Sequence, residues 1–458
     1  MVLHFVSVLQ RKYAVFKTSD TEMRVALAKR HLGRVLWRVL WFVSLPLTVP
    51  LAVFLRILLR LLKPFVHIRF GRLWSPRLGT FSLSTELDLC EKDAGLQPRD
   101  SVDIFYHYDQ DGYVLREPVK PKEAICNQQL NIMWKRTIHV HDFARVLDNL
   151  NRMLPHGKAF IAGGVRADGD YTDLLDLFPA HLSFTQAEEQ RGLLELDNLG
   201  IEPGAPFVCF HARDPAYLDH VRPRNAKLYG DWSWQNSRDT SIGNYLSAAV
   251  KLADLGYYAI RMGKYVREPL HCDNPRVIDY ASRFQSDFMD VFLSAKCDFF
   301  IGQGTGMTAL PITFRRPMGF VNIFPLYEIS SCAYCSYHKA IFIPKILYSA
   351  AKGRPLTFQE ILELGIGNFN VRRDPRHKEI SDRLGLEIRE NTPEEIAEVA
   401  LEMHQRLRSM FNSSEEDEEL QERFISIIRA YPHMVPVGKD RLVRVGTKFL
   451  RAHRDLLG

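Results

Sequence analysis

Arginines and small residues follow two apolar runs in the second half of the chain, at positions where buried strands would end. Arg213 and Asp214 come after one run, and Arg261 and Gly263 come at the end of the next. Doubly wound sheets bind ligands outside the carboxyl ends of their strands. A guanidinium there can hold a diphosphate through two parallel, charge-assisted hydrogen bonds. The pattern therefore favours an anion site, and pairing of Arg213 and Asp214 with neighbouring charges is the alternative.

A glycine-rich stretch after a third apolar run offers another way to hold an anion. It reads Gln303, Gly304, Thr305, Gly306 and Met307, and a helix is expected from about Thr305. Glycines let the backbone approach an anion, and a helix start offers unpaired N–H groups and a positive dipole end. We expect this stretch to converge with the arginines on one anion.

Ser286 and Asp287 begin another expected helix and leave two interpretations open. The serine hydroxyl could contact a phosphate, and the aspartate could bind a ribose hydroxyl. Both residue types are also frequent helix caps, which is a purely structural role.

A base that accepts a proton must lie within hydrogen-bond reach of that proton. The loop after the first strand of the second half holds three candidates: Asp214, Asp219 and His220. Asp214 is the preferred catalytic residue, beside Arg213. An ion pair of Asp214 with Arg213 or Arg238 is the alternative.

Motifs for a bound cofactor are missing or weak. The P-loop lysine motif and the G-x-G-x-x-G fingerprint are absent, which argues against kinases and dehydrogenases. Asp109 and Asp111 are the nearest approach to a metal-binding acid pair, but the glycine beside them indicates a solvated turn. The single C-x-x-C of residues 332–335 is a weak zinc signal. We expect no cofactor and no divalent metal, with arginines neutralising a leaving diphosphate.

From residue 64 onward, short apolar runs alternate with helical periods, which indicates βαβ units and parallel sheets. A helix over 184–201 begins with a capping box of Thr185 and Glu188 and stops at Gly200. The expected strands are 65–71, 101–108, 158–164, 207–211, 257–262, 276–280, 298–302 and 318–324. The fold class is therefore α/β, with two Rossmann-like domains.

This pattern divides the chain into four expected parts. Residues 1–63 form a basic segment with a membrane anchor, and residues 64–202 form the first Rossmann-like domain. Residues 203–410 form the second, which carries the anion site. Residues 411–458 are helical and long enough to cross back to the first domain.

The anchor is expected from an apolar run with basic flanks. Residues 39–55 carry no charge, and residues 23–85 contain no Asp or Glu but eleven Lys or Arg. As a helix this run would rise about 25 Å, short of the roughly 30 Å hydrocarbon core. Pro46 and Pro50 favour a kinked re-entrant hairpin. A single short span and a buried core helix are the alternatives.

Beyond the apolar run, the bases Arg56, Arg60 and Lys63 are spaced to face headgroups, with leucines toward the acyl chains. The localised basic surplus indicates an anionic membrane surface and no nucleic acid. The seven cysteines show no regular framework, which is typical of reduced thiols in a cytosolic compartment. We expect the cytoplasmic face of the inner (plasma) membrane.

Several stretches resemble a bacterial glycosyltransferase family with the GT-B fold. They are FVCFHARDPAYL (207–218), SRDTSIGNYLSAAVKLADLGYYAIRMG (237–263), SDFMDVFLSAKCDFFIGQGTGM (286–307) and FRRPMGFVNIFPL (314–326). The third stretch is also locally similar to the GDP-binding region of fucosyltransferases, whose H-x-R motif Arg213 would match. The resemblance implies a nucleotide-sugar donor held by the second domain.

On the acceptor side, the resemblance points to Arg77 and Gly79 in the first domain. The family pattern there reads close to R-I-G-H, and Thr80 replaces the histidine in this chain. No histidine role is therefore expected at that position.

The combined expectation is an inverting, metal-independent glycosyltransferase. It would move a sugar from a nucleoside-diphosphate sugar to a glycan or lipid-linked acceptor at the membrane surface. A sugar-nucleotide epimerase or a phosphatase with the same two-domain cleft is one alternative. A non-catalytic membrane-tethered scaffold is the other.

Overall fold

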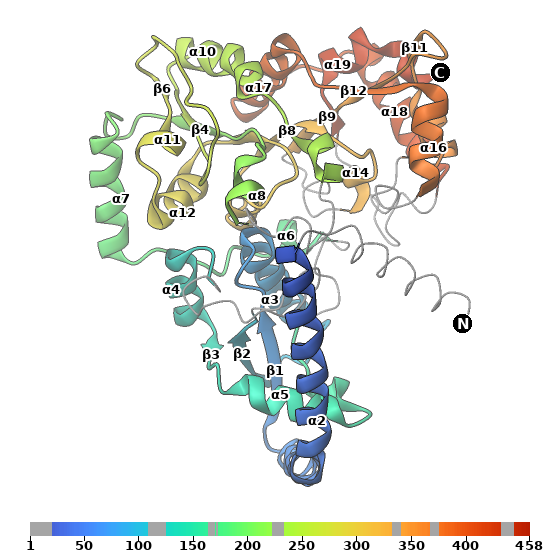
Figure 1. Cartoon of the computed structure of the whole chain (residues 1–458). Helices are drawn as coiled ribbons and strands as arrows, with labels where there is room; N and C mark the ends of the chain where they lie inside the picture. The colour runs from blue at the N-terminus through green and yellow to red at the C-terminus, as the bar shows by residue number, and fades with distance from the viewer. Residues whose placement is uncertain are drawn as a thin grey trace.

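The computed structural model of the chain describes residues 21–108, 125–163, 170, 173–221, 233–331, 340–366, 375–431 and 444–458. Within these ranges it contains two parallel sheets accompanied by helices (Figure 1), which confirms the α/β class. Asp109, Asp111 and the C-x-x-C of residues 332–335 lie outside the described residues.

Seven strands form what we call the C-terminal sheet, and each neighbouring pair is parallel. They are β4 (Phe207–Phe210), β5 (Tyr258–Arg261), β6 (Val277–Ile278), β7 (Phe300–Gly302), β8 (Met318–Ile323), β9 (Ala340–Pro344) and β13 (Arg444–Val445). Their order is β13-β9-β8-β7-β4-β5-β6. From β6 to β9 this is the Rossmann order 3-2-1-4-5-6, so the sheet reverses its winding between β4 and β7.

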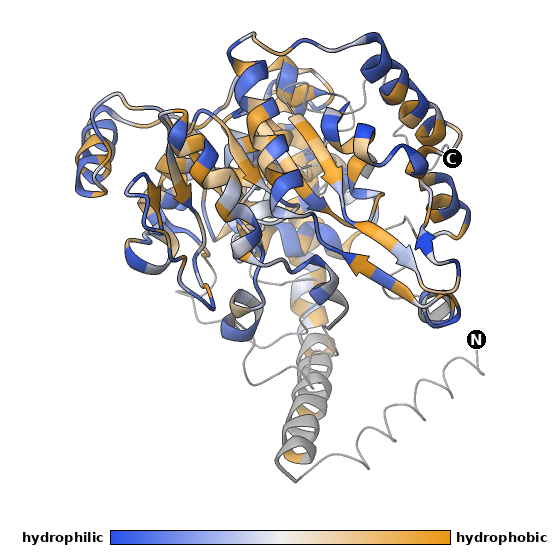
Figure 2. Cartoon of the chain, turned by 90° about the horizontal axis from the view of Figure 1, so that it is seen from above, coloured by the Kyte–Doolittle hydropathy of each residue, from blue (hydrophilic) through white to orange (hydrophobic). Residues whose placement is uncertain are grey.

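The strands β4, β5 and β7 are buried along their whole length, which explains their uninterrupted apolar sequences. Figure 2 shows hydrophobic residues gathered on strands in the interior. The longer helices of this part are α10 (Leu246–Asp254), α12 (Asp287–Lys296), α16 (Pro375–Leu384), α17 (Pro393–Leu407) and α18 (Glu415–Arg429). The shorter ones are α8 (Ala216–Val221), α11 (Tyr280–Arg283), α13 (Ala309–Thr313), α14 (Glu328–Ser331), α15 (Phe358–Glu363) and α19 (Thr447–Ala452). A small antiparallel sheet comprises β10 (Ile346–Ser349), β11 (Arg354–Pro355) and β12 (Leu386–Arg389).

The last segment of the chain stays with the C-terminal sheet. Strand β13 pairs with β9, and Phe424 on α18 lies against Phe342 and Phe358 at ring distances of 5.7 and 5.1 Å. The described parts of the segment expected to cross over, residues 411–431 and 444–458, thus make these contacts with the C-terminal sheet and its helices. The apolar face of α18 is buried locally, and this local burial decides where the segment packs.

Three parallel strands form the N-terminal sheet, in the order β1 (His67–Leu73), β2 (Ser101–His107) and β3 (His139–Val140). Its helices are α3 (Thr85–Asp93), α4 (Gln128–Thr137), α5 (Ala144–Met153) and α6 (Leu174–Leu177). The strand expected over 158–164 is wrong: Gly157–Phe160 is a 3-10 helix, and only a single bridge joins Ile161 to Phe70.

Helix α7 (Gln186–Asn198) begins with the expected capping box of Thr185 and Glu188. It packs against α12 of the C-terminal sheet, where Gly192 is essential: a Cβ there would lie 2.1 Å from the Phe292 ring.

The carboxyl edges of the two sheets meet. The loop after β1 reaches the loop after β7, where Gly79 and Gly306 touch through their backbones. Lys264, after β5, donates from Nζ to the Cys126 carbonyl at 2.8 Å. Asp287, at the start of α12, accepts from the backbone N–H of Gln128 at 2.7 Å. Loops from both sheets therefore surround the switch between β4 and β7.

Helix α2 (Thr21–Leu62) precedes the N-terminal sheet and includes both prolines of the apolar run, Pro46 and Pro50. The expected hairpin is therefore wrong, since the chain stays helical through both positions. By length and composition, Phe42–Leu62 could cross a membrane.

One narrow stripe of α2 packs on the N-terminal sheet. Leu55 and Leu59 are buried there, and Arg56 donates to the carbonyls of Asn151 at 2.7 Å and Pro155 at 2.8 Å. The expectation that Arg56 faces headgroups is wrong, because its guanidinium binds carbonyls at the C-terminal end of α5. The other faces of the helix expose apolar side chains: Phe42, Val43, Leu47, Leu51, Phe54, Ile57, Leu58 and Leu61.

Candidate functional site

Two arginines lie together at the switch point of the C-terminal sheet. Arg213 follows β4 and forms an ion pair with Asp239, with 13% of its side chain exposed. Arg238 lies next to Glu328, at 3.7 Å, with 19% of its side chain exposed. Both guanidinium groups thus combine partial burial with access to solvent.

The surroundings of Arg213 disfavour its positive charge. Burial, and after it the charge of Arg238, lowers the pKa of Arg213 to about 10. Arg213 stays protonated at neutral pH, but the nearby charge of Arg238 makes its own positive charge less favourable. An anion bound between the two arginines would offset the repulsion between their charges. The arrangement therefore favours anion binding.

In the turn after β7, the backbone of Gly304 lies close to Arg238 and Glu328. A Cβ on Gly304 would lie 2.6 Å from Glu328 Oε2 and 3.4 Å from Arg238 Nη2, so a larger residue would displace the Glu328 carboxylate. Gln303 is buried; its Oε1 accepts from the Thr240 hydroxyl at 2.8 Å, and its amide donates to the Arg238 carbonyl. The side chain of Gln303 therefore fixes the loop that carries Arg238.

The helix expected from Thr305 starts later. Helix α13 begins at Ala309 and has five residues, while the Thr308 hydroxyl accepts from the Thr305 N–H at 3.1 Å. The predicted helix-end contribution to anion binding is therefore not available from this short helix. Met307 is buried, and Gly306 faces Gly79.

Arg261, expected to bind an anion, is buried and bonded to other protein groups. It is 3% exposed and donates to the Glu268 carbonyl at 2.7 Å, with Asp279 3.4 Å away. These contacts shape the loop after β5. A Cβ on Gly263 in that loop would come within 2.9 Å of Val266. The structure places Arg261 at the end of β5 and Gly263 in the loop after it, and contact of either residue with a ligand stays a prediction.

Ser286 and Asp287 make the contacts of a helix start. The Ser286 hydroxyl accepts from the Met289 N–H at 3.2 Å, which caps α12. The Asp287 carboxylate binds Lys264 Nζ at 2.8 Å and the Gln128 N–H at 2.7 Å. Asp287 thereby links the two sheets in this conformation, and ribose binding stays a prediction.

The preferred base, Asp214, has both carboxylate oxygens occupied. They accept from the backbone N–H groups of Ala216 and Arg267, each at 2.6 Å. Asp219 pairs with Arg267 at 3.2 Å, and the His220 ring stacks on Tyr265 at 3.8 Å. These contacts hold the loop together and engage both of its carboxylates with Arg267 or backbone N–H groups.

Arg77 and Gly79, which were expected to face an acceptor, lie in the loop after β1, next to the glycine-rich turn. The Arg77 carbonyl accepts from the Phe81 N–H at 2.8 Å, and Gly79 contacts Gly306. The structure thus places both residues at the junction of the two carboxyl edges, and their role toward an acceptor stays a prediction.

One group with metal-ligand chemistry occurs among the described residues: Glu86, Cys90 and His181. Arg315 donates into it, to Glu86 Oε1 at 2.6 Å and to Cys90 Sγ at 3.4 Å. A guanidinium therefore occupies the place that a cation would take. The group joins the two sheets as an ion-pair cluster.

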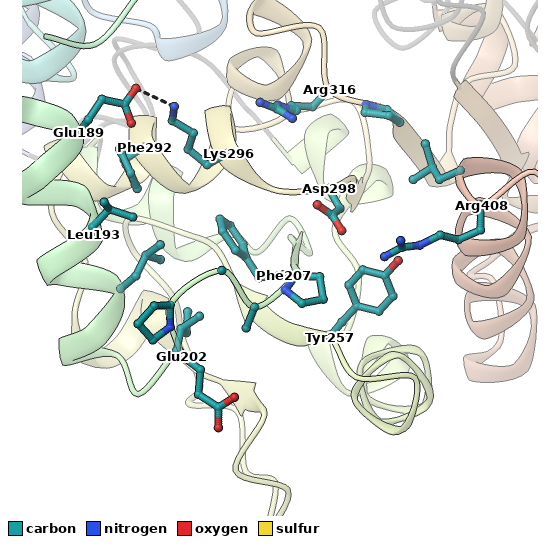
Figure 3. Close-up of a pocket in the computed structure, with 18 of the residues that line it drawn as sticks. Glu189, Leu193, Glu202, Phe207, Tyr257, Phe292, Lys296, Asp298, Arg316 and Arg408 are labelled. Atoms are coloured by element: carbon teal, nitrogen blue, oxygen red, sulfur yellow. Dashed lines mark hydrogen bonds and ion pairs between the residues drawn. The ribbon is translucent and has the colours of Figure 1, made fainter. Parts of the chain in front are cut away.

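A cavity of about 1040 Å³ lies at the opposite edge of the C-terminal sheet. Figure 3 shows Phe207, Tyr257 and Asp298 around it, at or just before the starts of β4, β5 and β7. The linker 202–206 closes one side. None of the candidate site residues lines this cavity, because it is at the amino ends of the strands.

From the sequence, Arg238 was expected only as an ion-pair partner of Asp214, and His211, next to Arg213 in the same strand-end group, was assigned no role. Arg238 lies far along the chain from the strand ends, and its position is set by Gln303. His211 directly follows the apolar run of β4, which was the available signal.

No family model and no curated protein matches the chain. The E. coli ADP-heptose LPS heptosyltransferase II structure is 13% identical, with a TM-score of 0.34, over 60% of this chain and 90% of that one. A family 9 glycosyl transferase from Veillonella parvula DSM 2008 is 10% identical, with a TM-score of 0.33, over 61% and 86%. Similarity at this level establishes neither a family nor a function for this chain. Neither structure is a fucosyltransferase, so that local resemblance stays a prediction.

Proposed function

We propose that the chain is a glycosyltransferase of the GT-B type that uses a nucleoside-diphosphate sugar. The observation that carries the proposal is the convergence of Arg213, Arg238 and the Gly304 turn at the switch point of the C-terminal sheet. Ligands of such sheets bind at the switch point. Two partly exposed arginines, next to the Gly304 backbone with no side chain in the way, suit a diphosphate better than a neutral ligand.

The chemistry of the proposed transfer is a displacement at the anomeric carbon of the sugar. A new bond forms to the acceptor oxygen as the bond to the diphosphate breaks on the opposite face, which inverts the configuration. The two arginines would stabilise the charge that develops on the leaving diphosphate. This arrangement supports a metal-independent reaction.

The acceptor would approach from the N-terminal sheet, because the loop with Arg77 and Gly79 faces the glycine-rich turn. The exposed apolar faces of α2 favour contact with a lipid bilayer. We therefore propose a glycan or lipid-linked acceptor, and attachment to the cytoplasmic face of the inner membrane.

A thermal-shift panel of GDP, UDP, CMP and dTDP on the full chain tests the proposal. A ligand that binds only the folded state at a hundred times its Kd stabilises by about 2.7 kcal/mol, which is readily visible. We expect a clear shift with one diphosphate. A chain that ignores the whole panel would be a scaffold. Turnover of a bound nucleotide sugar into a second nucleotide sugar, without acceptor, would indicate an epimerase.

A further inference from the structure

His211 occupies the end of β4, beside the proposed anion site. Its Nδ1 lies 3.0 Å from the Met262 carbonyl oxygen. A carbonyl can only accept a hydrogen bond, so Nδ1 carries the proton. In the neutral ring the lone pair therefore sits on Nε2.

The Nε2 atom makes no hydrogen bond with any of the residues described. The residue as a whole is half-buried, and Nε2 is not among the fully buried polar atoms that lack a partner in the described part of the chain, so a ligand atom can reach it. An acceptor atom with a fixed tautomer and a free lone pair is the arrangement that a proton-accepting base requires.

The acids around His211 are committed to other groups. Both oxygens of Asp214 accept backbone N–H groups, and Asp239 pairs with Arg213. Glu328 lies against Arg238. Among the described side chains at the switch point, His211 thus combines a fixed lone pair with an open position.

The charges nearby keep this ring neutral. Burial lowers the pKa of His211 to about 4, and Arg261 and Arg213 add to the effect. A diphosphate bound against Arg213 would offset the repulsion and raise the pKa of His211 again. The base would therefore gain strength when the donor is in place.

We propose that His211 is the catalytic base of the transfer, which rests on the proposed glycosyltransferase function. The acceptor hydroxyl gives its proton to Nε2 while its oxygen bonds to the anomeric carbon. The electron pair of the breaking bond leaves with the nucleoside diphosphate. The imidazolium then releases the proton to solvent.

Nitrogen NMR of the histidine-labelled full chain in detergent tests this directly, with the GDP, UDP, CMP and dTDP panel as probes. We expect the Nδ1–H tautomer for His211, a pKa below 6.5 in the free protein and a higher pKa with the diphosphate that binds. An Nε2–H tautomer, or a pKa that the bound diphosphate leaves unchanged, would overturn the base role alone. If no nucleotide binds, the donor assignment has failed, and the base role fails with it.

Two variants test the roles of the two ring nitrogens separately. Asn in His211→Asn can still donate to Met262 but lacks Nε2, while His211→Gln places a non-basic amide near the Nε2 position. We expect both to bind the diphosphate within about threefold of wild type and to lose about 10²–10⁴-fold in transfer rate. Full activity of His211→Asn, or loss of nucleotide binding in it, would contradict the base role. The tautomer measurement on the unaltered chain decides the matter if either variant fails to fold.

Discussion

Gly79 and Gly306 touch across the junction of the two sheets. A Cβ on Gly79 would lie 3.3 Å from the Gly306 Cα, and a Cβ on Gly306 would lie 3.3 Å from the Gly79 nitrogen. A side chain at either position would therefore press on the other loop and require a shift of a few tenths of an ångström. This contact sets how close the proposed acceptor loop comes to the proposed donor site.

Replacing Gly306 with Ala should push the two loops apart. We expect a loss of about 1 kcal/mol in unfolding free energy and a reduced transfer rate, measured by thermal melting and a transfer assay. Gly243→Ala is the control, since a Cβ there meets only the Ser241 hydroxyl at 3.5 Å. Equal behaviour of the two variants would show that the Gly79–Gly306 contact is unimportant.

Helix α2 offers a comparison between its packed and exposed sides. Arg56→Ala removes charge-assisted hydrogen bonds to the buried Asn151 carbonyl and the Pro155 carbonyl and should cost about 2–3 kcal/mol of stability. The exposed Arg60→Ala should stay within about 0.5 kcal/mol of wild type. Chemical denaturation in detergent measures both. An Arg56→Ala protein as stable as Arg60→Ala would mean that α2 is not anchored by this side chain.

Membrane contact should depend on the exposed side of the same helix. The double substitution Phe54→Asp and Leu61→Asp places charges on the apolar surface, and we expect weaker flotation with phosphatidylglycerol-containing vesicles at an unchanged melting temperature. Binding that is unaffected would assign the exposed apolar faces to something other than lipid.

The C-terminal sheet was largely predictable from the sequence, and the contacts that complete its site were not. Runs such as Phe207–Phe210 are apolar throughout because both faces of a parallel strand are buried, and this signal is local. Arg238 reaches the site through Gln303, 65 residues away, and no local pattern encodes that. Arg56 looked like a headgroup ligand because its partner, Asn151, is 95 residues distant.

Buried Asp290 predicts a specific pH dependence. Burial raises its pKa to about 7, and its Oδ1 lies 3.0 Å from a Tyr280 hydroxyl that also donates to the Ser286 carbonyl. The tyrosine has one proton, so a protonated Asp290 completes the network as donor. The folded state then holds a proton that the unfolded state releases, and stability is lost as the pH rises from about 4 through 7.

Asp290→Asn keeps a neutral hydrogen-bonding side chain and should remove this loss. We expect the variant to be more stable than wild type at pH 8, by on the order of 2 kcal/mol, with little gain at pH 4.5. Melting curves at the two pH values measure the difference, with the exposed Asp254→Asn as control. A constant difference between the two pH values would show that Asp290 is ionised in the folded state.

Transfer should need no divalent metal, because arginines are positioned to neutralise the leaving diphosphate. We expect the rate in excess EDTA to stay within about threefold of the rate in magnesium, measured as release of nucleotide. Complete loss in EDTA with recovery in manganese would move the donor site to a metal-binding group, with Asp109 and Asp111 the first to examine.

Calorimetric titration of Arg213→Ala with the diphosphate that binds wild type tests the central claim most directly. Loss of one charge-assisted contact costs on the order of 1.5–3 kcal/mol, so the Kd should rise about ten- to a hundredfold. The exposed Arg383→Ala on α16 is the matched control and should bind like wild type. If Arg213→Ala folds and binds the diphosphate as tightly as Arg383→Ala, the switch point of the C-terminal sheet is not the nucleotide site.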